Sequence, residues 1–215
     1  MLKILSEKNS VVNHFIAELR NVDVQNDRMR FRKNLERIGE VAAFEISKTF
    51  SYIDTEVTTP LGIAIVPMMS EPPVLATILR AGLPLHQGLL NYFDMADNGF
   101  ISAYRRHHKD GTFDIHLEYV ACPTIENRIL ILSDPMLATG QSLVLTYKAL
   151  MLKGKPKHTH IVTAIASTQG VAHVQANLSE NLTIWCGAID EELTSKSYIV
   201  PGLGDAGDLA FGKKD

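Results

Sequence analysis

Residues 128–150 read Arg-Ile-Leu-Ile-Leu-Ser-Asp-Pro-Met-Leu-Ala-Thr-Gly-Gln-Ser-Leu-Val-Leu-Thr-Tyr-Lys-Ala-Leu. The apolar start of this stretch is typical of a buried strand, and its second half is typical of a helix. Similar strand–helix units recur along the chain after Pro60. Strands are expected at 73–79, 128–133, 160–166 and 182–186, and helices at 83–93, 141–152 and 170–177. This alternation predicts an α/β fold with a mostly parallel central sheet flanked by helices.

The loop between strand and helix has the features of a phosphate site. Backbone N–H groups, the hydroxyls of Thr139 and Ser142 and the positive end of a helix dipole would meet there, at the carboxyl end of a strand. A side chain at Gly140 would keep a phosphate away from the backbone. No lysine follows this glycine, so the loop is not a P-loop, and Asp134 suits the hydroxyls of a ribose 5-phosphate. An ordinary helix capped by Thr139 or Ser142 is the alternative.

Three other segments have distinct patterns. The first 50 residues are expected to be helical, and Asp27 is placed to cap a long helix whose apolar residues recur at helical spacing, namely Phe31, Leu35, Ile38, Ala42 and Ile46. Residues 99–104 and 112–120 predict a hairpin or flap with a turn at Asp110-Gly111. The glycine-dense tail, 198–215, indicates either backbone held close to a ligand or a loose terminus.

Composition narrows the class of protein. The 215 residues fit one domain, with 46% hydrophobic and 21% charged residues, as in soluble globular proteins. A net charge of −3 argues against a surface that binds nucleic acid. The two distant cysteines, Cys122 and Cys186, are expected to be free thiols in a reducing compartment. We found neither a signal peptide nor an apolar stretch of about 18 residues, so a cytoplasmic protein without a membrane span is expected.

Three segments, in order, resemble one family. The loop Asp-Pro-Met-Leu-Ala-Thr-Gly-Gln-Ser at 134–142 resembles the phosphoribosyl pyrophosphate motif of type I phosphoribosyltransferases, in the form found in uracil phosphoribosyltransferases. Ile-Leu-Arg-Ala-Gly-Leu at 78–83 resembles their pyrophosphate loop, and Tyr-Ile-Val-Pro-Gly-Leu-Gly-Asp-Ala-Gly-Asp at 198–208 resembles their uracil-binding tail. Val-Thr-Thr-Pro-Leu-Gly at 57–62 and the N-terminal helices also fit.

The resemblance implies a type I phosphoribosyltransferase fold over 1–215, with an N-terminal helical segment at 1–50, a flap at 99–120 and a C-terminal hood at 187–215. It implies transfer of the phosphoribosyl group to uracil, giving UMP and pyrophosphate, with Mg²⁺ as cofactor. The chain would then act on these small molecules, without nucleic acid or membrane. Together with the amphipathic N-terminal helices, the resemblance also implies a homodimer or higher homo-oligomer.

The resemblance also implies roles for individual residues. The catalytic residues would be Asp205, Arg80 and Arg105, with Arg106 as the alternative to Arg105. The donor would be bound by Arg80, Arg105, Asp134, Pro135, Met136, Leu137, Ala138, Thr139, Gly140, Gln141, Ser142 and Asp205. Uracil would be bound by Tyr198, Ile199, Gly204, Asp205 and Ala206. Mg²⁺ would be held mainly by the donor, with Asp205 nearby.

Four departures from the family pattern stand out. The flap arginine is followed by basic residues instead of an acidic one, and the other departures are Ser133, Gln141 and Leu209. The basic cluster at 105–109 supports one alternative, a regulatory protein that keeps the fold, senses nucleotides and binds RNA. Transfer to another base is a second alternative. His158 and His160 lack an evident third ligand and are interpreted as surface or satisfied histidines, and Asp208 as structural.

Overall fold

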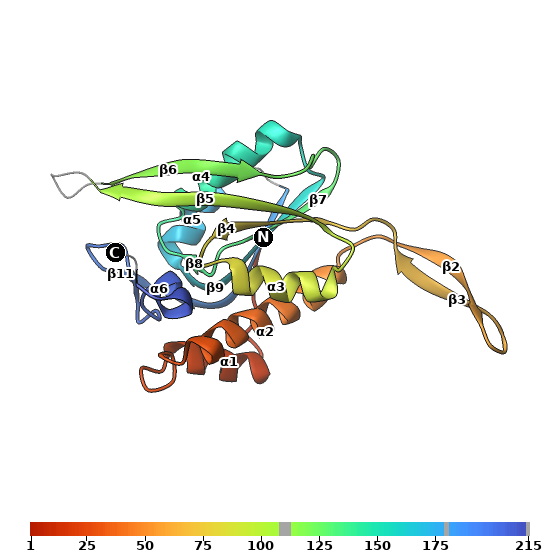
Figure 1. Ribbon diagram of the computed structural model, residues 1–215, viewed down its shortest axis with the longest axis horizontal. Coiled ribbons are helices and arrows are strands. Elements are labelled where there is room, and N and C mark those ends of the chain that lie inside the picture. Colours follow the sequence, from red (N-terminus) through yellow and green to blue (C-terminus); the bar gives the residue numbers. More distant parts are fainter. Residues whose placement is uncertain (108–112, 179–180, 214–215) are drawn as a thin grey trace.

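The computed structural model describes residues 1–107, 113–178 and 181–213, and for residues 103–107 and 113–117 it describes the backbone alone. Its central sheet is parallel except for the last strand (Figure 1). The strand order is β1 (Leu2–Ile4), β10 (Leu182–Asp190), β9 (His158–Ser167), β7 (Ile129–Ser133), β4 (Val74–Leu79), β5 (Asp97–His107) and β6 (Phe113–Ala121), and β8 (Met136–Leu137) pairs with β9. The sheet predicted from the alternating pattern is therefore confirmed.

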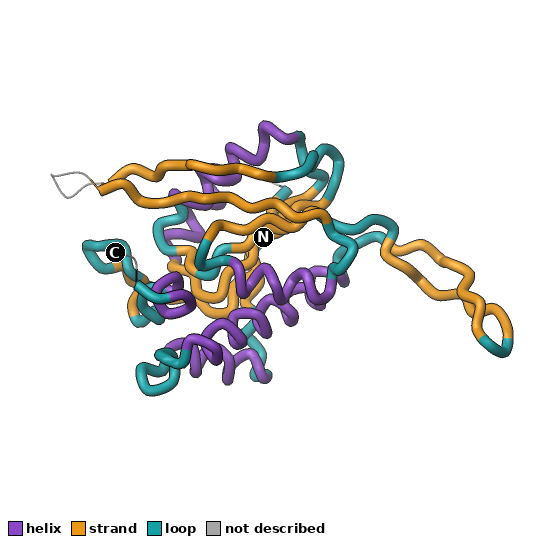
Figure 2. Tube along the Cα trace, in the orientation of Figure 1, coloured by secondary structure: helices purple, strands orange, loops and turns teal. Residues whose placement is uncertain are grey.

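Helices cover both faces of the sheet (Figures 1 and 2). One face carries α1 (Val11–Arg20), α2 (Arg28–Ser47) and α3 (Leu83–Tyr92), and the other carries α4 (Gln141–Leu150) and α5 (Thr168–Asn177). A short 3₁₀ turn, Met151–Lys153, follows α4. Alternate residues of each strand face opposite cores: Leu75 and Ile131 pack under α1–α3, whereas Ala76 and Leu132 pack under α4 and α5. The central strands β4 and β7 are mostly apolar, as is typical of strands that are buried on both faces.

The long helix α2 forms as its sequence pattern predicts. The Asp27 side chain accepts a hydrogen bond from the Arg30 backbone N–H at 3.0 Å and so caps the helix. Its apolar stripe is buried throughout, at Phe31, Leu35, Ile38, Ala42 and Ile46. Burying each large side chain of this kind stabilises the fold by about 1.5–3 kcal/mol, which fixes α2 on the sheet.

The expectation of helix over the first 50 residues is wrong at the start of the chain. Residues 2–4 form β1, which pairs in parallel with β10, and the Met1 amino group donates to the Leu182 carbonyl at 2.9 Å. A three-residue strand is too short to show a hydrophobic period, so only its neighbour in the sheet defines it. The predicted hairpin is confirmed by the antiparallel pairing of β5 with β6, and its predicted turn at Asp110-Gly111 lies outside the described residues.

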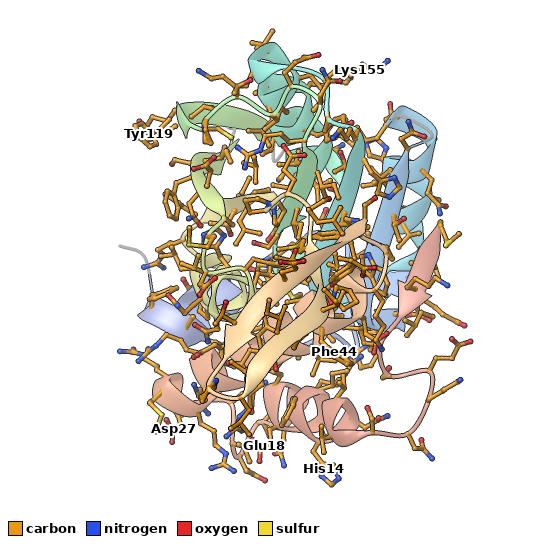
Figure 3. The ribbon with its side chains drawn as sticks, turned by 90° about the vertical axis from the view of Figure 1, so that its right-hand side faces the viewer. His14, Glu18, Asp27, Phe44, Tyr119 and Lys155 are labelled. Atoms are coloured by element: carbon orange, nitrogen blue, oxygen red, sulfur yellow. The ribbon has the colours of Figure 1, made fainter. Side chains whose placement is uncertain are left out.

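A second hairpin projects from the body of the molecule. β2 (Tyr52–Thr59) and β3 (Gly62–Met69) pair only with each other, and we call them the arm (Figures 1 and 2). Figure 3 looks along the arm toward the body. Its large apolar side chains are exposed, namely Tyr52, Ile53, Val57, Leu61, Ile63, Ile65, Val66 and Met68. In the described parts of the chain, no helix has the length and apolar character to cross a membrane.

Candidate active site

Two neighbouring strands bring the first site segments together. β4 and β7 run in parallel with Thr77 opposite Ser133; Asp134 comes directly after Ser133, and Arg80 comes directly after the last residue of β4, Leu79. The Thr77 hydroxyl donates to the Ser133 carbonyl at 3.2 Å, and the buried Ser133 hydroxyl donates to the Ala76 carbonyl at 3.3 Å. Ser133 thus ties the two strand ends together, and the segments 78–83 and 134–142 leave the same edge of the sheet.

The phosphate loop, residues 134–142, is anchored along β9. The Asp134 N–H donates to the Val162 carbonyl at 3.0 Å, and the Pro135 carbonyl accepts from the N–H groups of Ala164 and Ile165, both at 3.1 Å. Residues Met136 and Leu137 form β8, which pairs with β9. A pocket lies over the loop and is lined by Asp134, Met136, Leu137, Ala138, Thr139, Gly140, Ser142 and Leu143. The loop is therefore a fixed part of the sheet edge.

The end of this loop is the N-terminus of α4. Gly140 is its N-cap residue with a φ of 76°, a left-handed conformation that favours glycine. A Cβ at Gly140 would also lie 2.9 Å from the Gly170 carbonyl oxygen. The N-cap residue is thus Gly140 and not Thr139 or Ser142, and Thr139 Oγ1 accepts a hydrogen bond from the Gln141 N–H at 3.4 Å. The exposed Gln141 side chain leaves the positive end of α4 beside the pocket.

Two residues of the loop's support were not predicted. The Ser167 hydroxyl donates to the Ala138 carbonyl at 2.6 Å and accepts from the Gly170 N–H at 2.8 Å. A Cβ at Gly170 would lie only 2.3 Å from the Ala138 oxygen, so α5 packs directly on the loop. A serine three residues before this glycine is a helix-capping signal in the sequence, but it does not tell which loop the helix contacts.

Arg80 links the sheet edge to the C-terminal tail. Its Nη2 donates to Asp208 Oδ1 at 3.2 Å and to the Gly212 carbonyl at 2.7 Å. Its Nε is buried and has no hydrogen-bond partner among the described residues. A donor left in this way, on a guanidinium at the carboxyl end of β4, is suited to an anionic ligand. Asp208, interpreted as structural from sequence, is the ion-pair partner of this arginine.

The tail is ordered and lies beside Arg80. β12 (Ile199–Val200) pairs with β11 (Glu192–Leu193), and the tail ends in α6 (Ala206–Phe211). Asp205 caps α6 by accepting from the Asp208 N–H at 2.9 Å. A Cβ at Gly207 would lie 3.8 Å from that of Ala81, next to Arg80, which places the tail against the pyrophosphate loop. The interpretation as a loose terminus is therefore wrong for residues 198–213.

The predicted base-binding residues differ in exposure. Asp205 and Gly204 are exposed, whereas Ile199 and Ala206 are buried. Tyr198 as a whole residue is 45% exposed, open enough to contact a ligand. The other predicted donor residues, Arg105 and its alternative Arg106, lie on β5 opposite Ile115 and Asp114. Their side chains lie outside the description, so the choice between the two stays a prediction.

The two histidines are hydrogen-bonded parts of the fold, and His160 is buried. Trp185 Nε1 donates to His160 Nδ1 at 3.0 Å, and His158 Nε2 lies 2.9 Å from the Thr183 hydroxyl. Burial lowers the pKa of His160 to about 3, so the ring is neutral at physiological pH. The prediction of satisfied histidines is confirmed. In the described ranges, no three His, Cys, Asp or Glu side chains gather as metal ligands. Cys122 and Cys186 are free thiols, as expected.

Comparison with known proteins identifies the family. A family model described as uracil phosphoribosyltransferase matches residues 6–213. The chain is 55% identical over 210 residues to a uracil phosphoribosyltransferase of Porphyromonas gingivalis, covering 98% of this chain and 97% of the relative. For one of Thermococcus gammatolerans, the identity is 36% and the coverage 96% and 91%.

Solved structures agree with this assignment. The AQ2163 protein from Aquifex aeolicus superposes with a TM-score of 0.87 at 29% identity, covering 99% of this chain and 98% of that one. A hypoxanthine phosphoribosyltransferase from Staphylococcus aureus shares the fold, with a TM-score of 0.51 at 16% identity and coverage of 87% and 84%. The expected fold, a type I phosphoribosyltransferase fold, is thus confirmed, and the chain belongs to the uracil phosphoribosyltransferase family.

Proposed function

We propose that this protein transfers the 5-phosphoribosyl group from phosphoribosyl pyrophosphate to N1 of uracil, giving UMP and pyrophosphate. The observation that supports this most is the meeting of three segments at one edge of the sheet: the phosphate loop, Arg80 and the tail. The whole chain would act as one domain, with residues 99–120 as flap and residues 187–215 as hood. The family model and the curated relatives support this enzyme reading and not the RNA-binding alternative.

The phosphate loop and two cations would hold the donor. The N-terminus of α4 and the hydroxyls of Thr139 and Ser142 would bind the 5-phosphate, and Asp134 would accept from the ribose hydroxyls. Arg80 and Arg105 would stabilise the negative charge that develops on the leaving pyrophosphate. In this step the C1–O bond breaks, its electron pair leaves with pyrophosphate, uracil N1 bonds to C1, and the N1 proton passes to water. Because the acceptor attacks directly, no covalent nucleophile is needed.

The site residues also fit Mg²⁺. This ion prefers oxygen ligands and is usually bound through one or two carboxylates together with substrate phosphates. The exposed Asp205 carboxylate, beside the partner of Arg80, supplies such an oxygen, and the described residues form no closed cage of three ligands. Mg²⁺ bound to the donor would neutralise part of the pyrophosphate charge.

The tail would bind the base through its backbone. Uracil presents two carbonyls and two N–H groups, which peptide groups at Ile199 and Gly204 can pair with. Asp205 and Ala206 would complete the pocket, and Tyr198 would flank the ring. A site built on such hydrogen bonds rejects a base with the wrong pattern, because its own polar groups are then left unpaired.

The direct test is an assay for UMP with uracil, the donor and Mg²⁺. The wild type should form UMP, and Asp205→Ala should lose at least tenfold in kcat/KM, while cytosine and hypoxanthine should give no nucleotide. Filter binding of RNA at physiological salt is the companion measurement, with no retention expected. Absence of UMP, together with RNA retention, would replace the enzyme with the regulatory alternative.

We also propose that the protein is a homodimer or higher homo-oligomer. An isolated two-stranded hairpin is marginally stable in water, and the arm exposes large apolar side chains such as Leu61 and Ile63. A second copy packed on the arm would bury them. Light scattering should give at least a dimer for the wild type and a monomer for Ile63→Glu combined with Ile65→Glu. The control is Leu152→Glu, which alters an even more exposed apolar residue away from the arm.

The proposed location is the cytoplasm. A reducing compartment keeps thiols such as Cys186 free, as they are in this structure. Cell fractionation tests this directly: recovery of the protein in the membrane or exported fraction would contradict it.

A further inference from the structure

One residue of the tail is held on both sides by an ion pair from distant parts of the chain. Asp190, at the end of β10, accepts from the Gly202 N–H at 2.9 Å through Oδ2. Arg20, at the end of α1, donates from Nη1 to the Gly202 carbonyl at 3.0 Å. The two side chains also pair as a fork, with both N–O distances 2.8 Å. We call Arg20 and Asp190 the clamp.

The clamp is built into the interior of the protein. The Asp190 side chain is 6% exposed and that of Arg20 is 23% exposed. A carboxylate with so little solvent needs all of its hydrogen bonds, and a forked arginine restricts its direction as well as its charge. Both polar backbone groups of Gly202 are therefore fixed by groups that cannot easily turn away.

The fixed residue lies between the two that are proposed to bind the base. Gly202 comes three residues after Ile199 and two before Gly204. Its φ is 55°, and a Cβ there would lie 2.1 Å from the Ile199 carbonyl oxygen, so the turn is folded tightly onto Ile199. Gln25 Nε2 adds a weaker bond to the Leu203 carbonyl at 3.3 Å. A movement of Gly202 would therefore move the backbone on both sides of it.

We infer that Arg20 and Asp190 are positioning residues for base recognition, an inference that rests on the proposed function. Neither acts on uracil itself; the clamp sets where the peptide groups of Ile199 and Gly204 lie. Hydrogen bonds to the base depend on that position, so a displaced tail would bind uracil more weakly. Sequence reasoning did not find the pair, since 170 residues separate its members.

The donor half of the site has supports of its own. The phosphate loop is held by β9 and by Ser167, and α6 is held separately by Arg32, whose Nη1 donates to the Ala210 carbonyl at 2.7 Å. None of these bonds involves the clamp. Weakening the clamp should therefore impair uracil binding and leave donor binding largely intact.

The experiment measures KM for each substrate and kcat in two clamp variants. Asp190→Asn keeps the shape of the side chain and removes its charge, and Arg20→Lys keeps the charge and removes the fork. In both, KM for uracil should rise at least tenfold, while KM for the donor and kcat at saturating uracil change less than threefold. The control is Glu18→Gln, which breaks another forked pair on α1, to Arg30, at 2.8 and 2.9 Å (Glu18 is labelled in Figure 3). It should leave both KM values unchanged.

Hydrogen–deuterium exchange provides a readout that does not depend on activity. In Arg20→Lys, amides of residues 198–205 should exchange faster than in the wild type, while those of residues 134–142 stay the same. The inference is overturned by an unchanged KM for uracil, by equal rises in both KM values, or by unchanged exchange in the tail. A wild type that makes no UMP refutes the proposed function instead, and the exchange result then still shows whether the clamp holds the tail.

Discussion

Replacing Gly170 by alanine should weaken binding of phosphoribosyl pyrophosphate, although the new side chain would make no contact with this donor. A Cβ at this position would lie 2.3 Å from the Ala138 oxygen and 2.7 Å from the Leu137 oxygen. Ordinary contact begins at 3.4 Å, so the Ala138 carbonyl must retreat by about 1 Å in a close-packed interior. Both carbonyls belong to the phosphate loop, and the loop would move with them.

The expected effect is large. A misplacement of about 1 Å in a binding constellation costs on the order of 100-fold, which corresponds to about 2.7 kcal/mol of transition-state stabilisation. We therefore expect kcat/KM for phosphoribosyl pyrophosphate to fall about 100-fold in Gly170→Ala. Steady-state assays at saturating uracil, with the donor varied, measure this directly, and calorimetric titration of the donor measures its binding alone.

Gly39→Ala is the matched control. A Cβ at Gly39 would lie 2.3 Å from the Leu85 carbonyl oxygen, an equal overlap located between α2 and α3. Both variants should unfold at lower temperature than the wild type, and only Gly170→Ala should lose donor affinity. The reasoning would be refuted by unchanged donor binding in Gly170→Ala, or by an equal loss in Gly39→Ala.

Three further predictions concern the loop, the flap and the buried histidine. Ser167→Ala removes the hydroxyl that binds the Ala138 carbonyl and should raise KM for the donor about tenfold, as for one lost buried hydrogen bond; an unchanged KM would contradict this. Arg105→Ala should bind the donor more weakly than the wild type, and Arg106→Ala should bind it as the wild type does. Isothermal titration calorimetry of both variants measures this, and weaker binding by Arg106→Ala alone would assign the role to Arg106. His160 has a folded pKa of about 3, below its unfolded value, so its contribution to stability is full above about pH 6.5 and is lost as the pH falls toward 3. Protonation of this group should lower the free energy of unfolding by about 2 kcal/mol between pH 7.5 and pH 5. Urea titrations at the two pH values test this: the fall in unfolding free energy should be about 2 kcal/mol larger for the wild type than for His160→Phe.

The parts of the fold that could be predicted from the sequence are those in which apolar residues recur at regular spacing. In α2, the spacing of Phe31, Leu35 and Ile38 predicts a buried stripe, and the apolar run 129–133 predicts a buried strand. The arm could not be predicted in this way. Its apolar residues, such as Ile63 and Ile65, are exposed and pack on no core, so their spacing does not indicate a buried face. The strand at residues 2–4 was missed because it is defined only by its partner.

The candidate site was predictable to the extent that it lies within contiguous segments. The loop at 134–142 could be interpreted as a phosphate site from its own residues, and the resemblance supplied Arg80 and the tail. The supports Ser167 and Gly170, and the clamp of Arg20 with Asp190, depend on which distant segments become neighbours. That information arises from the order of strands in the sheet, which local sequence patterns do not report.

The clamp has a consequence for the order in which the protein matures during synthesis. The loop 134–142 and its supports are all present once the chain has been made through Gly170. The tail, in contrast, requires Arg20 from the beginning of the chain and Gly202 from near its end to be present together. Synthesis therefore supplies every segment of the phosphate loop and its supports before it supplies the last segment of the base pocket. A ribosome-bound chain stalled after α5 would contain residues 134–142 and Gly170 and would lack Gly202, the residue that the clamp holds.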